Sequence, residues 1–282
     1  MKKLATTLVV SLGLVAFGCD KKKEEGTVQK QDPGAAAKPT EPAKPPEPPK
    51  VEPLQGAALA DKYRACVDMV SGAKFDEFKK ECVDESFSVH AFAGMPEVKG
   101  ADGVIGWMKD MKTAMPDWKL APQLVIVSGR NILAVNLVTG THSGPMKTPM
   151  GEVPATNKKV GHLMFHRLKI SDANKATDEW AVGDMATMMG QLGLAPKTAS
   201  PTRPAMDKGM DGAPVVVVTA DDAKEKANLE VVKKGNEAFL ANKPADIMAT
   251  MTDDAVEMDQ SGDKDVKGKK DIEKGFVMFR NA

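Results

Sequence analysis

A few histidine and acidic side chains hold most of the chemistry that this sequence could carry. Trp180, Val182 and Asp184 alternate along a predicted strand, so they share one of its faces. The hairpin before them can place His166 opposite Asp184, whereas a slip of one residue would point the two side chains apart. An aspartate in an apolar pocket has a raised pKa, which suits proton abstraction next to a carbonyl group. The alternative is a buried aspartate that pairs with a histidine or arginine for structural reasons.

His162 and His166 have the spacing of a zinc pair on a helix, but their surroundings predict a strand. Residues 160–168 alternate in polarity, and positions four apart on a strand are separated by about 13 Å along one face. Two imidazoles at that separation cannot share one ion, so we predict no metal site here. His162 is then a wall of a pocket or a satisfied surface histidine. The sequence contains no glycine-rich phosphate loop, no G-x-S-x-G elbow and no H-E-x-x-H motif, and we predict no cofactor.

The composition is that of a chain with a sizeable core and no excess of charge. The 282 residues allow one or two domains, and 42% of them are hydrophobic. Lysine plus arginine and aspartate plus glutamate each number 39, which argues against a dedicated nucleic-acid binder. Only three cysteines are present, so neither a disulfide framework nor a Cys₄ zinc site is possible.

The elements that must position these residues follow from hydrophobic periodicity. Helices are predicted over Leu59–Val70, Phe75–Val83 and Ala101–Met115, and strands over Trp118–Val127, Ile132–Thr141, Val160–Ile170 and Trp180–Met188. Three helices followed by an antiparallel sheet predict an α+β domain over residues 57–194. Asn136 and His142 lie on one face of their strand, where they can line a cavity.

Several motifs in this domain resemble those of a known family. They are V-K-G-A-D-G before the third helix, P-D-W after it, V-T-G-T-H-S-G, M-F-H-R-L, E-W-A-V-G-D and M-M-G-Q-L-G. Together they resemble the SnoaL-like polyketide cyclase group of the nuclear-transport-factor-2-like superfamily, over residues 57–194. That resemblance implies a curved antiparallel sheet wrapped around helices, a cone with a pocket at its wide end.

The resemblance also implies roles for particular side chains. Asp184 takes the position of a general acid/base, and His166 on the neighbouring strand helps to bind the substrate. His90, after the second helix, takes a place at the pocket mouth, although a surface loop is the alternative. With Asn136, His142 and His162, Trp180 completes the predicted ligand-binding set. Residues 171–178 make the hairpin before Trp180 longer than is usual in the family, which bears on the register of Asp184.

The N-terminus has the pattern of a lipoprotein signal. Two lysines precede an uncharged stretch, Leu4–Phe17, which is too short to span a bilayer but suits a secretory signal. Ala16-Phe17-Gly18-Cys19 resembles a bacterial lipobox, so we expect residues 1–18 to be removed and Cys19 to carry lipid; an ordinary signal peptide is the alternative. Residues 19–56, rich in proline and lysine, predict a disordered tether. The expected location is the bacterial cell envelope, anchored to a membrane through Cys19.

The end of the chain repeats its beginning. Residues 195–220 contain four prolines and predict a linker, and a capping-box pattern then precedes a helix. Val98-Lys99-Gly100 aligns with Val266-Lys267-Gly268, and the apolar positions of the third helix align with those of residues 272–282. Residues 221–282 therefore predict the N-terminal part of a second SnoaL-like domain. No equivalent of the first sheet follows, so we expect either a truncated form of a longer chain or a half-domain that docks on another sheet.

Cys66 and Cys82 occupy apolar positions on the first two helices. Outside the cytoplasm a disulfide between them is permitted, and two buried free thiols are equally consistent with the sequence.

The leading prediction for function is binding of a small apolar or amphipathic ligand in the cone pocket. One alternative is a cyclase or isomerase that uses Asp184 as general acid/base and His166 to orient the substrate. Another is an interaction module whose sheet face forms a homodimer. The fold alone does not choose among them, because the superfamily contains both enzymes and binding proteins.

Overall fold

A computed structural model describes residues 51–90, 96–148, 151–195, 202–209, 214–258 and 262–281. The lipobox, the predicted tether up to residue 50 and Ala282 lie outside the described residues. Among the helices of the described part, none is long and apolar enough to cross a membrane.

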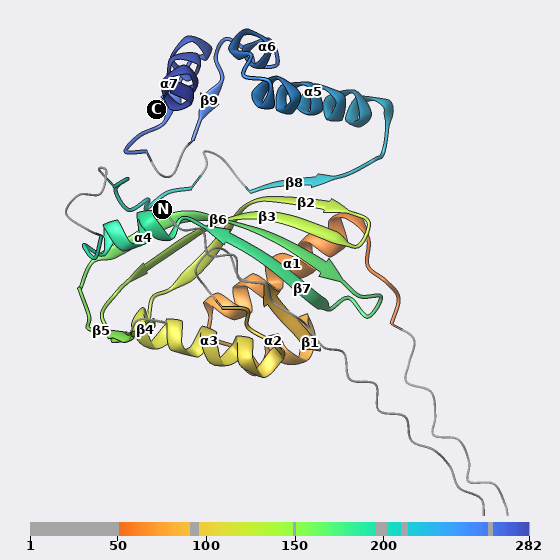
Figure 1. Cartoon of the computed structure of the whole chain (residues 1–282). Helices are drawn as coiled ribbons and strands as arrows, with labels where there is room; N and C mark the ends of the chain where they lie inside the picture. Colours follow the sequence, from red (N-terminus) through yellow and green to blue (C-terminus); the bar gives the residue numbers. More distant parts are fainter. Residues whose placement is uncertain are drawn as a thin grey trace, which may run out of the picture. The chain divides into compact units, whose positions relative to one another are not determined.

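The predicted α+β cone is confirmed. Helices α1 to α3 lie on one side of a curved, open sheet (Figure 1). The strands run in the order β1-β7-β6-β3-β2-β8, in which β1 pairs with β7 and β8 with β2 in parallel and all other pairs are antiparallel. The elements of the cone are α1 (Gly56–Ser71), α2 (Phe75–Cys82), β1 (Val83–His90), α3 (Ala101–Ala114), β2 (Lys119–Ser128), β3 (Asn131–Thr141), β4 (Met146–Thr148), β5 (Gly151–Val153), β6 (Lys159–Ile170), β7 (Ala176–Gly183), α4 (Met185–Gln191) and β8 (Val215–Val218).

The core lies between the helices and the concave face of the sheet. Side chains of α1 to α3 pack there against alternate residues of the central strands, among them Val125, Val127 and Ile132. A disulfide joins Cys66 on α1 to Cys82 on α2, so the two thiols of the alternative hypothesis are bonded to each other. The bond fixes the two helices that form one wall of the interior.

Three details of the strands differ from the predictions. The strand expected over Trp180–Met188 stops at Gly183, because Asp184 caps α4. The stretch after the second helix, where no strand was predicted, is β1, and the bridge Val89–Val98 holds its end. The predicted linker contains β8, a run of four valines directly after Pro214, where β-propensity prevails.

Several of the family-like motifs have local structural reasons. Gly100 has φ +73°, a left-handed conformation that favours glycine, directly before α3. A Cβ on Gly144 would lie 2.1 Å from the carbonyl oxygen of Thr113, so the chain after β3 approaches the end of α3 more closely than any other residue type allows. The side-chain amide of Gln191 exchanges two hydrogen bonds of 2.9 Å with the backbone of Gly161, which ties α4 to β6.

The long hairpin between β6 and β7 has a structural use. Its Asn174 accepts a hydrogen bond from the backbone N–H of Leu54 and donates one to the carbonyl oxygen of Glu52. The segment that leads into α1 is thereby tied to the sheet. The extra residues of the hairpin therefore hold the segment before α1 against the sheet.

Residues 221–281 form a separate set of elements with its own small core around Ala238, Ile247, Met248 and Ile272. The elements are α5 (Ala223–Leu240), α6 (Pro244–Met248), β9 (Val256–Glu257), β10 (Val266–Lys267) and α7 (Lys269–Asn281). The capping box is present, since Asp222 accepts from the N–H of Glu225 and the Glu225 carboxylate accepts from two backbone N–H groups. That this segment is a second copy of the cone's first part stays a prediction of the sequence.

Candidate functional site

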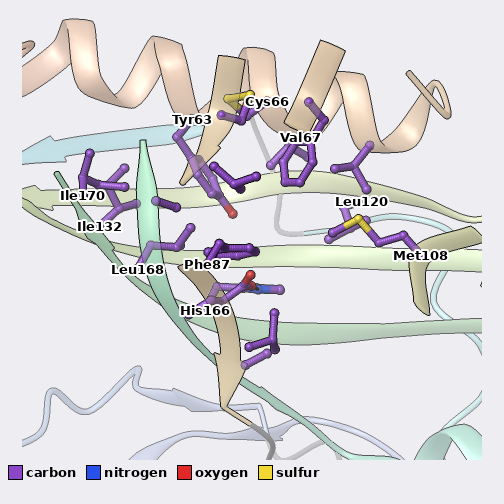
Figure 2. A pocket seen from close by; sticks show the side chains of 18 of the residues that line it. Tyr63, Cys66, Val67, Phe87, Met108, Leu120, Ile132, His166, Leu168 and Ile170 are labelled. Carbon is purple, nitrogen blue, oxygen red and sulfur yellow. Dashed lines mark hydrogen bonds and ion pairs between the residues drawn. A yellow bond between two sulfur atoms is a disulfide. The ribbon is translucent and has the colours of Figure 1, made fainter. Parts of the chain in front are cut away.

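A cavity of about 120 Å³ lies inside the cone, between the helices and the concave face of the sheet (Figure 2). Its wall is mostly aliphatic, aromatic and sulfur-containing, and includes Val67, Val70, Phe78, Phe87, Met108, Leu120, Ile132, Leu168 and Ile170. The disulfide between Cys66 and Cys82 belongs to the same wall. The few polar side chains of this lining are therefore the ones that could give a ligand orientation.

His166 and Glu179 form the central polar pair of this wall. The Nδ1 atom of His166 lies 2.5 Å from Oε1 of Glu179, and the side chains are only 7% and 13% exposed. The register explains the pairing: His166 is opposite Ala181, so Glu179, two residues before Ala181, points to the same concave face. The Nε2 atom of His166 has no hydrogen-bond partner among the described residues.

A second polar pair lies deeper in the interior. Asn136, which is fully buried on β3, donates a hydrogen bond of 2.7 Å from Nδ2 to the hydroxyl of Tyr63, which lines the cavity. Burial raises the pKa of Tyr63, and the negative charge of Glu179 raises it further, so its hydroxyl stays protonated. Asn136 thus contributes to the cavity through Tyr63 and does not line it directly.

The expected pairing of His166 with Asp184 is wrong. Asp184 is the N-cap of α4: its carboxylate accepts hydrogen bonds from the backbone N–H of Thr187 at 3.0 Å and from the Thr187 hydroxyl at 2.6 Å. Partial burial pushes the pKa of Asp184 up, but these hydrogen bonds and the nearby His162 outweigh it, so the pKa lies below its ordinary value. The raised pKa of a general acid is therefore absent, and Asp184 does not line the cavity.

Trp180 lies on the outer face of the sheet, because it alternates with Glu179 and Ala181 on β7. The guanidinium of Arg167 is 4.9 Å and the amine of Lys169 is 5.0 Å from the centre of its ring. Trp180 does not contact the cavity.

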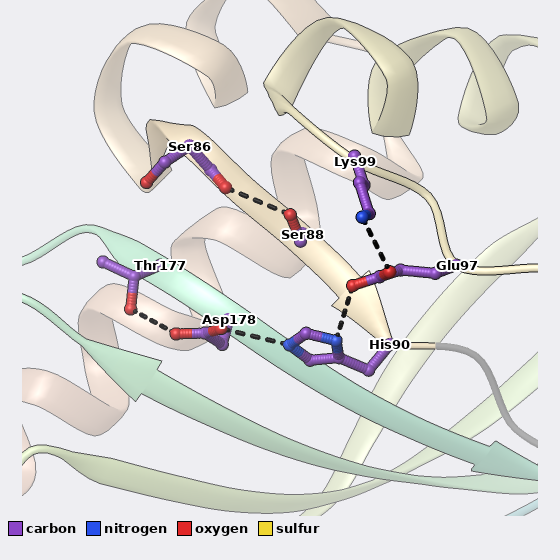
Figure 3. A network of polar contacts seen from close by, with 7 residues as sticks. All are labelled: Ser86, Ser88, His90, Glu97, Lys99, Thr177 and Asp178. Atoms are coloured by element: carbon purple, nitrogen blue, oxygen red, sulfur yellow. Dashed lines mark hydrogen bonds and ion pairs between the residues drawn. The ribbon is translucent and has the colours of Figure 1, made fainter. Parts of the chain in front are cut away.

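His90 is also turned away from the cavity, at the edge where β1 meets β7 (Figure 3). Its two ring nitrogens lie 2.9 Å from Glu97 and 3.0 Å from Asp178, and its ring packs on Trp180 at 4.6 Å. The hydrogen bond from His90 lowers the pKa of Asp178. The neighbouring Val89 lines the cavity instead, as alternation along a strand requires.

The other two predicted histidines are buried outside the cavity lining. Nδ1 of His142 lies 3.1 Å from the hydroxyl of Thr156, and burial lowers the pKa of both His142 and His162. Within the described ranges, no group of three histidine, cysteine or acidic side chains could hold a metal ion. Cys19 lies outside the described residues.

Sequence reasoning missed Glu179 and Tyr63. Trp180 and Asp184 suggested which face of β7 points inward, but the small Ala181 is the buried neighbour. Glu179, Ala181 and Gly183 alternate along β7 and lie on its inner face. Their small side chains are the sequence signal that identifies this face. Tyr63, the one tyrosine of the chain, lies within the predicted helix Leu59–Val70, whose apolar periodicity gives no sign of a polar role for its hydroxyl.

The comparisons with known proteins agree with this architecture. Residues 60–192 match the model of the family described as SnoaL-like polyketide cyclase, and this part of the chain is a SnoaL-like domain. No curated protein matches the chain.

The chain is also similar to solved structures, among them the following three. A SnoaL-like protein from Jannaschia sp. CCS1 is 18% identical, with 49% of this chain and 93% of that one covered and a TM-score of 0.43. IdmH from Streptomyces antibioticus is 21% identical, with 48% and 98% covered and a TM-score of 0.40. A SnoaL-like polyketide cyclase from Agrobacterium tumefaciens is 19% identical, with 49% and 99% covered and a TM-score of 0.40.

Proposed function

We propose that the cone cavity binds a small, mostly apolar molecule about the size of one ring. The observation that carries this proposal is an interior cavity of about 120 Å³ with an aliphatic and aromatic wall and one buried polar pair, His166 and Glu179. A cavity of roughly 150 Å³ with an apolar wall stays dry and takes up benzene. A ligand of that kind would therefore fill an empty apolar space and form van der Waals contacts with its wall.

The expected affinity is modest. A ring that loses about 150–250 Å² of accessible surface gains about 4–6 kcal/mol at ~25 cal/mol per Å². This corresponds to a Kd between about 1 mM and 0.04 mM. Ligands with a matching polar group would bind more tightly.

Benzene, titrated into the full chain and followed by ligand-observed NMR, tests this proposal. Ala181→Leu adds three carbon atoms to the cavity wall and should weaken benzene binding at least tenfold. Val182→Leu enlarges the adjacent side chain, which is 55% exposed on the other face, and should leave the Kd unchanged. Equal affinities in both variants would show that benzene binds elsewhere.

An enzyme of the cyclase or isomerase type is the second candidate, and the buried His166–Glu179 pair favours it. In this proposal His166 moves the proton and Glu179 positions its ring, in place of Asp184. Enzyme-dependent exchange of deuterium from solvent into the C–H bonds of a bound compound, lost in His166→Phe, would support it. Absence of exchange with compounds that do bind would leave a binding protein.

Two further expectations accompany this proposal. The lipobox pattern supports a lipid anchor on Cys19 in the bacterial envelope; Cys19→Ala should release the protein from membrane fractions.

A homodimer through the outer sheet face is supported by the exposure of Leu133, Phe165 and Val182, which are about half exposed. Light scattering of the wild type and Phe165→Glu would decide it: equal monomer masses would end that expectation.

A further inference from the structure

We propose that the ligand of the cavity is an amphipathic monocarboxylate, whose apolar body fills the cavity and whose carboxylate lies at the cavity edge against the ammonium group of Lys62. This inference rests on the proposed function and specifies its ligand class. Lys62 belongs to the cavity lining, and its side chain is 26% exposed, so it reaches both the apolar interior and solvent. No other lysine or arginine belongs to the described lining.

The position of Lys62 on α1 explains this double reach. Leu59 lies three residues before it and Cys66 four residues after it, so the three side chains form one row along the helix. Leu59 and Cys66 are buried and line the cavity, and Cys66 projects towards it from α1 (Figure 2). A lysine in such a row buries its aliphatic stem against apolar neighbours and keeps its ammonium group in water. The charge of Lys62 therefore lies at the edge of the cavity.

The ammonium group of Lys62 is only weakly engaged. Its Nζ atom lies 3.9 Å from Oε2 of Glu81, beyond the length of about 2.7–3.2 Å that is typical of a hydrogen bond, and it donates no hydrogen bond to the described residues. Glu81 also lies 3.7 Å from Lys80, so a second cation stays beside Glu81 when a ligand takes Lys62. The Cys66–Cys82 disulfide joins the two helices at this place. The fold thus holds a cation with spare donors beside an apolar cavity.

An organic anion of one charge fits this arrangement. Burial of an ionised group in an apolar wall is costly, so the charged head of a ligand stays at the solvent edge, where Lys62 lies. A carboxylate brings one negative charge, which matches one ammonium group. A phosphate monoester carries a charge of about −1.5 to −2, and Glu81 would repel the excess. The cavity volume of about 120 Å³ limits the apolar body to about one six-membered ring.

Cyclohexanecarboxylate and cyclohexanecarboxamide form the matched pair for the test, because they have the same ring and nearly the same head shape but differ in charge. Binding of both to the full chain is measured at neutral pH by ligand-observed NMR. We expect the carboxylate to bind about three- to tenfold more tightly at low salt, between the contribution of an exposed ion pair and that of a hydrogen bond to a charged group. At roughly 1 M salt the Debye length is about 3 Å, and the preference should shrink towards equality. This salt dependence tests the charge without any variant.

Lys62→Met is the decisive variant, because it keeps an apolar stem and removes the charge. The carboxylate and the carboxamide should then bind with equal affinity. Glu81→Gln removes the negative charge beside Lys62 and should strengthen binding of the carboxylate about two- to threefold. Lys80→Met is the matched control: Lys80 is similarly close to Glu81, is 82% exposed and does not belong to the lining, so the preference for the carboxylate should remain.

The failures of the two proposals are distinguishable. Equal binding of the carboxylate and the carboxamide to the wild type at low salt would overturn the inference and leave a cavity for uncharged ligands, which benzene would still enter. A preference that survives in Lys62→Met would overturn it too, because the carboxylate would then be recognised elsewhere. If benzene, the carboxylate and the carboxamide all fail to bind at millimolar concentration, the proposed function falls as well.

Discussion

Replacement of Asp184 tests whether this residue acts as a helix cap or as a catalytic carboxylate. In the structure Asp184 begins α4 by accepting two hydrogen bonds from Thr187, at 3.0 Å and 2.6 Å. Asp184→Ala removes both, and loss of an N-cap costs about 1 kcal/mol, within a range of about 0.5–2. For a domain of this size, that lowers Tm by about 3 °C. Asp184→Asn keeps an acceptor for the N–H of Thr187 and should lose only a few tenths of a kcal/mol.

The pH dependence of this effect has a fixed sign. The pKa of Asp184 in the folded protein lies below its ordinary value, so ionised Asp184 stabilises the fold. That contribution is complete above the unfolded pKa of about 3.9 and is lost as the pH falls through the lower folded pKa. The difference in unfolding free energy between wild type and Asp184→Asn should therefore vanish at a pH below the folded pKa of Asp184.

The assay is thermal unfolding of the full chain, with the Kd for benzene measured on the same samples. Asp172→Ala, an exposed carboxylate in the hairpin between β6 and β7, is the control and should change neither quantity. We expect Asp184→Ala to lower Tm and to leave the Kd for benzene within twofold of the wild type. Loss of ligand binding in Asp184→Asn at unchanged Tm would refute the assignment of Asp184 as a cap.

Three further predictions concern stability. Reduction of the Cys66–Cys82 disulfide, whose cysteines are 16 residues apart, should lower the free energy of unfolding by about 3 kcal/mol, measured by urea titration with and without reductant. Gly106→Ala, with nothing within 4 Å of the new Cβ, should stabilise α3 by about 0.5–1 kcal/mol. Gly144→Ala should destabilise the folded domain, because its Cβ would meet a backbone oxygen. Equal Tm values for the two variants would contradict this packing. Burial lowers the pKa of His162, so its contribution to stability is present above about pH 6.5 and is lost as the pH falls through the folded pKa. The plot of Tm against pH should therefore be flatter for His162→Leu than for the wild type. An unchanged plot would show that other groups cause the loss of stability in acid.

The helices and central strands could be read from the sequence because their apolar positions repeat with a clear period. The predicted helix over Ala101–Met115 and the observed α3 differ by one residue. The short edge strands β1 and β8 could not be found in this way. Their pairing is parallel, to partners distant in the sequence, and neither shows a clean alternation of burial.

The candidate site was predicted in part, because its outcome depended on one register. His166 lines the cavity, a position that its expected role in substrate binding requires. Its partner was wrong, since the face of β7 was chosen from the large Trp180 and the acidic Asp184. Trp180 is instead covered by cationic side chains on the outer face, and Asp184 lies beyond the end of the strand. A shift of one residue on a strand moves every side chain to the other face, and hydrophobicity alone did not fix it here.

The most direct test of the ligand-binding cavity is the position of bound benzene in the full chain, read from intermolecular nuclear Overhauser effects. The account predicts contacts to methyl groups of the wall, such as those of Val67, Ile132 and Leu168. Contacts to Leu133 and Val182 on the outer face, with none to the wall, would contradict it and favour an interaction surface.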